Sequence, residues 1–130
     1  MGGVKMPYIK NENHRREALQ IGEPALTAGE LNYQIFYYVK HNWIESNDKE
    51  LEEIIEKYTN QFLGDKPNYQ RYNDMTGALI RCGKEIERRL DYDKYDVEGL
   101  RTLLEYIMEN YDDKIAEYED KKILENGDVE

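Results

Sequence analysis

The amino-acid sequence predicts an all-α protein, a small helical bundle of four main helices preceded by one short N-terminal helix. Apolar residues recur with the 3.6-residue period of an amphipathic helix in four successive segments. The alternation typical of a strand does not persist for more than four residues in any part of the sequence. All three prolines fall within the first 67 residues, which leaves the second half free to form long helices.

The first helices are bounded by residues that start or stop a helix. Residues 11–20 predict a short helix, which ends before Pro24. Thr27 and Glu30 have the spacing of a capping box, in which each side chain accepts a hydrogen bond from the backbone of the other residue. We therefore expect the first long helix to begin after Thr27 and to cover residues 28–45.

Three further helices are predicted, over residues 48–63, 68–90 and 97–124, each from a continuous apolar stripe. The third long helix contains Gly77 and Gly83 in its interior, where each glycine costs about 1 kcal/mol relative to alanine. Glycines in these positions indicate that another backbone or a ligand comes close to the helix.

The length of 130 residues fits one domain. We expect an extended arm over residues 1–10, a single helical domain over residues 11–125 and a C-terminal tail over residues 126–130. No apolar run is long enough for a transmembrane span, and no signal peptide is visible. The single cysteine, Cys82, excludes an internal disulfide and suits a reducing cytoplasm, so we expect a cytoplasmic protein.

The formal net charge of −10 argues against general nucleic-acid binding and against binding to anionic membranes, because both partners would be repelled. The charge is unevenly distributed, however. Residues 66–90 contain six basic and three acidic residues, although the chain as a whole is acidic.

A basic stripe on the third long helix is the first candidate site, and it consists of Gly77, Arg81, Lys84 and Arg88. A glycine beside three cations, with Asn73 nearby, is a surface that can hold a phosphate. The alternative interpretation is a solvated helix face whose cations pair with Glu85, Glu87 and the acidic C-terminal segment.

An acidic pattern is the second candidate site, and it would bind Mg²⁺. Apart from this alternative, we expect no cofactor. The EExxE and ExxD patterns are similar to those of all-α nucleotide pyrophosphohydrolases, in which four carboxylates converge on the metal. The residues are Glu52, Glu53, Glu56, Glu109 and Asp112. About fifty residues separate the two halves, whereas that family brackets one short helix–turn–helix.

Other chemistry has little support in the sequence. Cys82 lies between basic residues but flanks an apolar face, so we interpret it as a core residue.

The first long helix is apolar over two adjoining stripes, and the chain contains 12 tyrosines. These features predict a homo-oligomer with Phe36, Val39 and Trp43 at or near the contact.

Several segments, in a fixed order, resemble a widespread family of short, functionally uncharacterised proteins of bacteria, archaea and phages. They are Met6-Pro7-Tyr8-Ile9-Lys10, Gly29-Glu30-Leu31-Asn32-Tyr33, Tyr72-Asn73-Asp74, Gly77-Ala78-Leu79, Lys84-Glu85, Arg88-Arg89, Tyr118-Glu119-Asp120-Lys121-Lys122 and Asn126-Gly127-Asp128-Val129. The chain departs from that pattern by inserting residues 90–117 before the Tyr-Glu-Asp segment and by ending in Glu130 rather than in an aromatic residue. The resemblance implies a compact helical domain and supplies no activity.

The polar positions of these segments, together with the basic stripe, predict a ligand site between the first and third long helices. Its residues are Asn32, Tyr33, Tyr72, Asn73, Arg81, Lys84, Arg88 and Arg89. We therefore expect a non-enzymatic, oligomeric protein that binds a small anion such as a nucleotide, and a phage protein that sequesters nucleotide signals would fit. The alternatives are the Mg²⁺-dependent pyrophosphohydrolase and a protein–protein adaptor or inhibitor that uses its acidic last helix.

Overall fold

The computed structural model describes residues 14–45 and 47–126. Within these ranges the chain forms six helices and no strand, which confirms the all-α prediction. The helices are α1 (Arg15–Gln20), α2 (Ala28–Asn42), α3 (Asp48–Leu63), α4 (Tyr69–Arg89), α5 (Val97–Glu109) and α6 (Asp112–Asn126). The expected arm over residues 1–10 and residues 127–130 of the expected tail lie outside the described residues.

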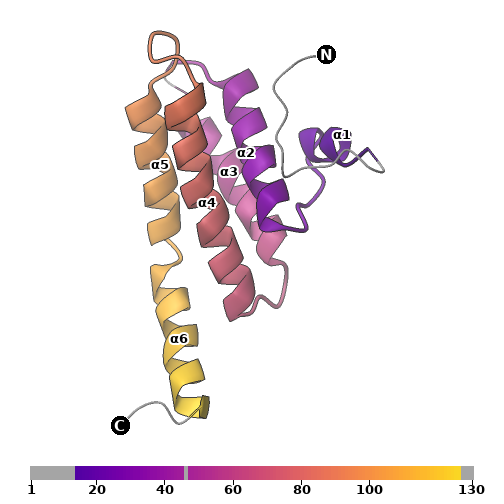
Figure 1. Cartoon of the computed structure of the whole chain (residues 1–130), viewed down its shortest axis with the longest axis vertical. Coiled ribbons are helices and arrows are strands. Elements are labelled where there is room, and N and C mark those ends of the chain that lie inside the picture. Colours follow the sequence, from indigo (N-terminus) through magenta and orange to yellow (C-terminus); the bar gives the residue numbers. More distant parts are fainter. Residues whose placement is uncertain (1–13, 46, 127–130) are drawn as a thin grey trace.

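Helix α4 is the element around which the others are arranged, since it contacts α2, α3, α5 and α6. Figure 1 shows α2, α3, α4 and α5 side by side, with the short α1 lying against the outside of α2. The most extensive contacts join α4 to α2 on one side and to α5 on the other. Any site between the first and third long helices therefore lies between α2 and α4.

The predicted helix limits agree with the structure where a side chain caps the helix. The Asn68 side chain accepts a hydrogen bond from the backbone N–H of Arg71 at 2.8 Å, and Asp96 accepts one from Gly99 at 3.0 Å. Helix α2 ends at Asn42, three residues earlier than predicted, because Trp43 has an extended backbone. The Asn42 amide donates to the carbonyl of Tyr38 at this end of the helix.

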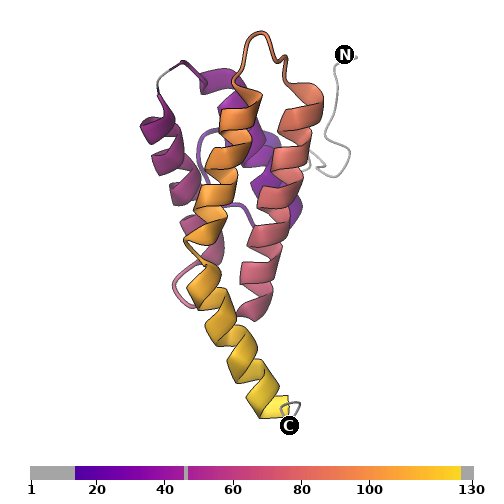
Figure 2. The same cartoon turned by 90° about the vertical axis from the view of Figure 1, so that its left-hand side faces the viewer.

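The prediction of one helix over residues 97–124 is wrong, because the chain is interrupted between α5 and α6. At the interruption the Asn110 backbone N–H donates to Ile107 and that of Tyr111 to Met108, a tighter turn than that of an α-helix. The described residues thus contain five long helices rather than four. Figure 2 shows α6 running on from α5 beyond the lower end of α4.

The residues expected at an oligomer contact belong largely to the core of the single chain. Phe36 and Val39 are buried in the core of the chain and offer no exposed apolar surface for such a contact. Trp43 is half-buried, and its ring lies 5.5 Å from that of Tyr95. The homo-oligomer itself stays a prediction.

Helix α4 buries Cys82 and Gly83 along one face, and a Cβ atom at Gly83 would lie 3.9 Å from Leu104 of α5. This is an ordinary van der Waals distance, so alanine would also fit at position 83. Within the described residues, no helix combines the length and the apolar character needed to cross a membrane.

Candidate functional site

A hollow of about 280 Å³ lies between the start of α2 and the middle of α4, and we call it the α2–α4 hollow. Each helix contributes two consecutive small residues and a polar residue that lies three positions after the second of them. The lining residues are Ala28, Gly29 and Asn32 of α2, and Gly77, Ala78 and Arg81 of α4. The small side chains leave space between two helices that otherwise pack closely.

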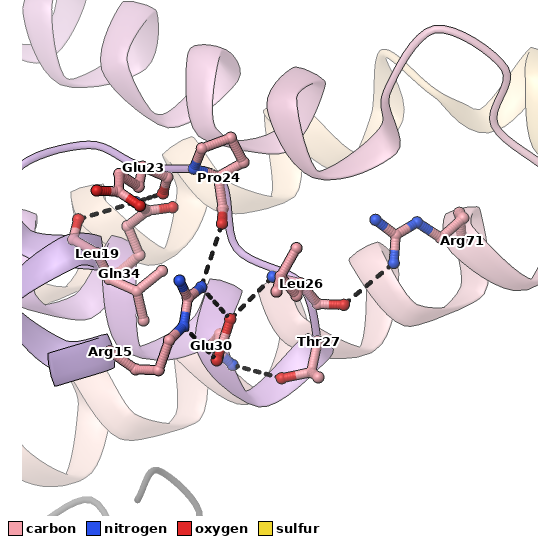
Figure 3. Close-up of polar contacts among 9 residues, drawn as sticks. All are labelled: Arg15, Leu19, Glu23, Pro24, Leu26, Thr27, Glu30, Gln34 and Arg71. Carbon is pink, nitrogen blue, oxygen red and sulfur yellow. Dashed lines mark hydrogen bonds and ion pairs between the residues drawn. The ribbon is translucent and has the colours of Figure 1, made fainter. Parts of the chain in front are cut away.

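The start of α2 is fixed by a polar network around Glu30 (Figure 3). The Thr27 hydroxyl accepts from the Glu30 backbone N–H at 3.1 Å, as the capping box predicts. The Glu30 carboxylate, however, accepts from the backbone of Leu26 at 2.9 Å and from Arg15, not from Thr27. Arg15 approaches both carboxylate oxygens, at 3.0 and 2.7 Å, and also donates to the Pro24 carbonyl.

Two further side chains hold the segment that leads into α2. Gln34 donates to the carbonyls of Leu19 at 2.9 Å and Glu23 at 2.8 Å. Arg71 of α4 donates to the Leu26 carbonyl at 3.2 Å and to the carbonyl of Phe62 at 2.7 Å. The first turn of α2 is therefore tied to α1, α3 and α4, and its residues Ala28 and Gly29 form a well-supported wall of the hollow.

The electrostatics of the hollow favour an anion. Arg81 contributes an exposed guanidinium at one edge. The backbone N–H groups in the first turn of α2 have no acceptor within the helix and form its positive end. Glu30 lies in the same turn, but the Arg15 guanidinium holds the pKa of this carboxyl below its usual value and pairs with its charge.

The lining of the hollow also limits its chemistry. Its only polar side chains are the buried amide of Asn32 and the guanidinium of Arg81. An amide does not titrate, and a guanidinium stays protonated in proteins. These six residues can thus bind and orient a ligand, but they contain neither a nucleophile nor a general base.

Of the eight residues predicted for the ligand site, Asn32 and Arg81 line the hollow. Tyr33 is buried, and its hydroxyl accepts from the Gln20 amide at 2.7 Å. Tyr72 is buried at the other side of α4, where its ring lies 5.5 Å from that of Tyr118. The two tyrosines are therefore core residues.

The remaining predicted residues lie on other parts of α4. Asn73 is exposed, and Lys84 lines a separate cavity of about 100 Å³ between α4 and α5. Arg88 and Arg89 lie 3.7 and 3.5 Å from a carboxylate oxygen of the buried Glu85. Although the cations of the basic stripe share the exposed face of α4, only Arg81 reaches the hollow.

The five carboxylates of the alternative metal site are not gathered at one point. Within the described ranges, no group of three or more His, Cys, Asp or Glu side chains could hold a metal ion. Glu56 instead accepts a hydrogen bond from the Asn110 amide at 3.1 Å, which links α3 to the junction between α5 and α6.

Cys82 is fully buried in α4, and burial raises the pKa of its thiol well above the usual value. The side chain is therefore protonated and inaccessible, as expected for a core cysteine.

Sequence reasoning missed the residues that create the hollow, namely Ala28, Gly29 and Ala78, and it missed the partnership of Arg15 with Glu30. The repeated pattern of two small residues and a polar one was present in both helices. This pattern could have indicated the hollow, provided that α2 and α4 were known to be neighbours.

Comparison with known proteins places the chain in a family without assigning an activity. No curated protein and no solved structure matches the chain. Residues 6–129 match a family described as a domain of unknown function (DUF6899), and the chain therefore belongs to this family.

Proposed function

We propose that this protein binds a small anionic molecule in the α2–α4 hollow and does not transform it. The Arg81 guanidinium can form bidentate hydrogen bonds with a phosphate or a carboxylate. The first turn of α2 adds a partial positive charge at the opposite wall. The absence of a nucleophile or general base among the six lining residues supports binding rather than catalysis.

The size and the lining of the hollow favour a compact ligand. Its volume of about 280 Å³ lies just below the common range of about 300–1,000 Å³ for small-molecule sites. Four of the six lining residues are alanine or glycine, so an apolar part of the ligand can pack against both helices. No aromatic ring is among them, so a nucleotide would be held through its phosphate rather than by stacking of its base.

Gly77 is the observation that carries this proposal. It is exposed in the interior of α4, and a Cβ atom there would meet no described atom within 4 Å beyond its own helix. Alanine would fit and would favour the helix by about 1 kcal/mol. Because no packing requirement in the described residues explains this glycine, we infer that it keeps the hollow open for a ligand.

The test is calorimetric titration with inorganic phosphate, small carboxylates, and mono-, di- and cyclic nucleotides, with and without Mg²⁺. For any anion that binds, Arg81→Gln should weaken affinity about 10- to 100-fold, the range expected for a hydrogen bond to a charged group. Gly77→Leu should abolish binding, because its side chain would fill the hollow. Arg88→Gln is the matched control on the same helix and should change affinity less than about twofold, since Arg88 lies against Glu85.

Failure of every anion in the panel to bind would contradict the proposal, as would equal losses in the two arginine variants. Binding that requires Mg²⁺, followed by hydrolysis of a nucleotide, would favour the pyrophosphohydrolase instead.

A further inference from the structure

Two adjoining grooves are lined by residues of the α2–α3 link, the α4–α5 loop and the starts of α3 and α5. Figure 1 shows that this link and this loop lie at the same end of the molecule. The first, of about 370 Å³, is lined by aromatic residues that include Trp43, Tyr92 and Tyr95. The second, of about 550 Å³, contains Tyr106 and shares Asp96 with the first. We call this pair the end grooves.

The aromatic rings of the end grooves are partly fixed and partly exposed. Tyr95 donates its hydroxyl to the Lys40 carbonyl at 2.8 Å, and its ring lies 5.5 Å from that of Trp43. Tyr92 and Tyr106 are 65% and 50% exposed, so their rings are not packed into the core. The end grooves thus combine a held aromatic pair with two rings that a partner can cover.

The charges of the end grooves are complementary to a cation. Five exposed carboxylates line them, those of Glu45, Asp48, Asp93, Asp96 and Glu98, and Lys94 is the one basic side chain in the lining. Among the described residues, none of the five forms an ion pair. The five carboxylates and Lys94 together carry a charge of −4. The N-termini of α3 and α5 contribute about +0.5 each, so a local charge of about −3 remains.

We propose that the end grooves bind an arginine-rich segment of a partner protein. A guanidinium can stack on an aromatic ring while its edge pairs with a carboxylate, and the end grooves place the two kinds of group together. A lysine-rich segment would satisfy the charge but would use the ring faces less well. This surface is separate from the α2–α4 hollow, and the proposal does not depend on the anion ligand.

The only tryptophan of the chain, Trp43, reports directly on this surface. Titration with an octa-arginine peptide should change its fluorescence and give a saturable affinity, tighter than that of octa-lysine by at least about twofold. The variant Asp93→Asn/Asp96→Asn should weaken octa-arginine binding by at least about fivefold, and the asparagine at position 96 retains an oxygen that can cap α5. Tyr92→Leu, which leaves the net charge unchanged, should weaken it about two- to fivefold.

The control is Glu117→Gln/Glu119→Gln, which removes two exposed negative charges from α6. It should change octa-arginine affinity less than about twofold, and circular dichroism should show that every variant is folded. Equal losses in the two double variants would overturn the proposal, because binding would then follow net charge alone. Equal affinities for the two peptides, or saturation without a change in Trp43 fluorescence, would overturn it as well.

Discussion

Replacing Glu30 by glutamine tests whether the start of α2 depends on its ionic network. Glutamine keeps the length of the side chain but removes the charge that Arg15 contacts at 2.7 and 3.0 Å. The two side chains are 23% and 14% exposed, so water screens the pair only in part. Because hydrogen bonds to charged groups contribute about 1.5–3 kcal/mol, we expect Glu30→Gln to lower the free energy of unfolding by about 2 kcal/mol.

The same chain offers an exposed ion pair as a control. Arg101 lies 3.2 Å from Glu87, and these side chains are 42% and 48% exposed. Exposed pairs contribute about 0.2–1 kcal/mol, so Glu87→Gln should lower the free energy of unfolding by less than about 0.5 kcal/mol. Urea unfolding followed by far-UV circular dichroism at neutral pH measures both losses.

The dependence on pH provides a second measurement on Glu30. Its pKa in the folded chain is lowered by the hydrogen bond from Arg15, and also by that from Leu26, relative to the ordinary value of 4.5. The contribution of Glu30 is therefore complete above pH 4.5 and is lost as the pH falls through the lowered pKa. The difference between wild type and Glu30→Gln should shrink in this acidic range. Equal losses in the two glutamine variants, or a difference that does not change with pH, would refute the reasoning.

Three further predictions concern buried and half-buried side chains. Tyr111→Phe should lower the free energy of unfolding by about 1 kcal/mol in urea titrations, because the hydroxyl contacts Thr59 at 3.0 Å and Asn60 at 2.8 Å. Burial raises the pKa of the Tyr58 and Tyr111 phenols in the folded chain, so the unfolded chain loses these protons first and stability should fall as the pH rises above 10.0. A thiol reagent should modify Cys82 only after unfolding, and rapid reaction of the native protein would contradict its burial.

Much of the fold follows from local sequence, because helix periodicity and capping are local properties. Helices α4 and α5 begin within one residue of the predicted positions 68 and 97, where the short polar side chains of Asn68 and Asp96 accept from free backbone N–H groups. The interruption after α5 could not be found in this way. The apolar stripe continues through Ile107, Tyr111 and Ile115 with helical spacing, so the pattern itself contains no stop.

The cause of the interruption is tertiary. Asn110 donates to Glu56 and Tyr111 to Asn60, so two consecutive residues of the junction are tied to α3.

The candidate site likewise depends on contacts between helices that are not visible in the local sequence. Helical spacing correctly assigns the basic stripe to one exposed face of α4, but α2 and α5 determine which cation faces a hollow. Arg81 faces α2, whereas Lys84 lines the cavity against α5.

Salt should distinguish the two proposed sites, because the chain has a net charge of −10 while the sites have opposite local charges. An anion in the α2–α4 hollow is attracted by Arg81 and repelled by the rest of the molecule, and salt weakens both effects. An octa-arginine peptide is attracted both by the carboxylates of the end grooves and by the net negative charge of the molecule. Salt therefore weakens its binding without compensation. Between low salt and about 0.15 M, where charges more than about 8 Å apart are largely screened, we expect a much steeper loss of affinity for the peptide than for the anion. Titrations of both ligands over one salt series measure the two slopes. If the affinity for the anion instead rose with salt, repulsion by the net charge would dominate without a local positive site, and this would contradict the assignment of the anion to the hollow.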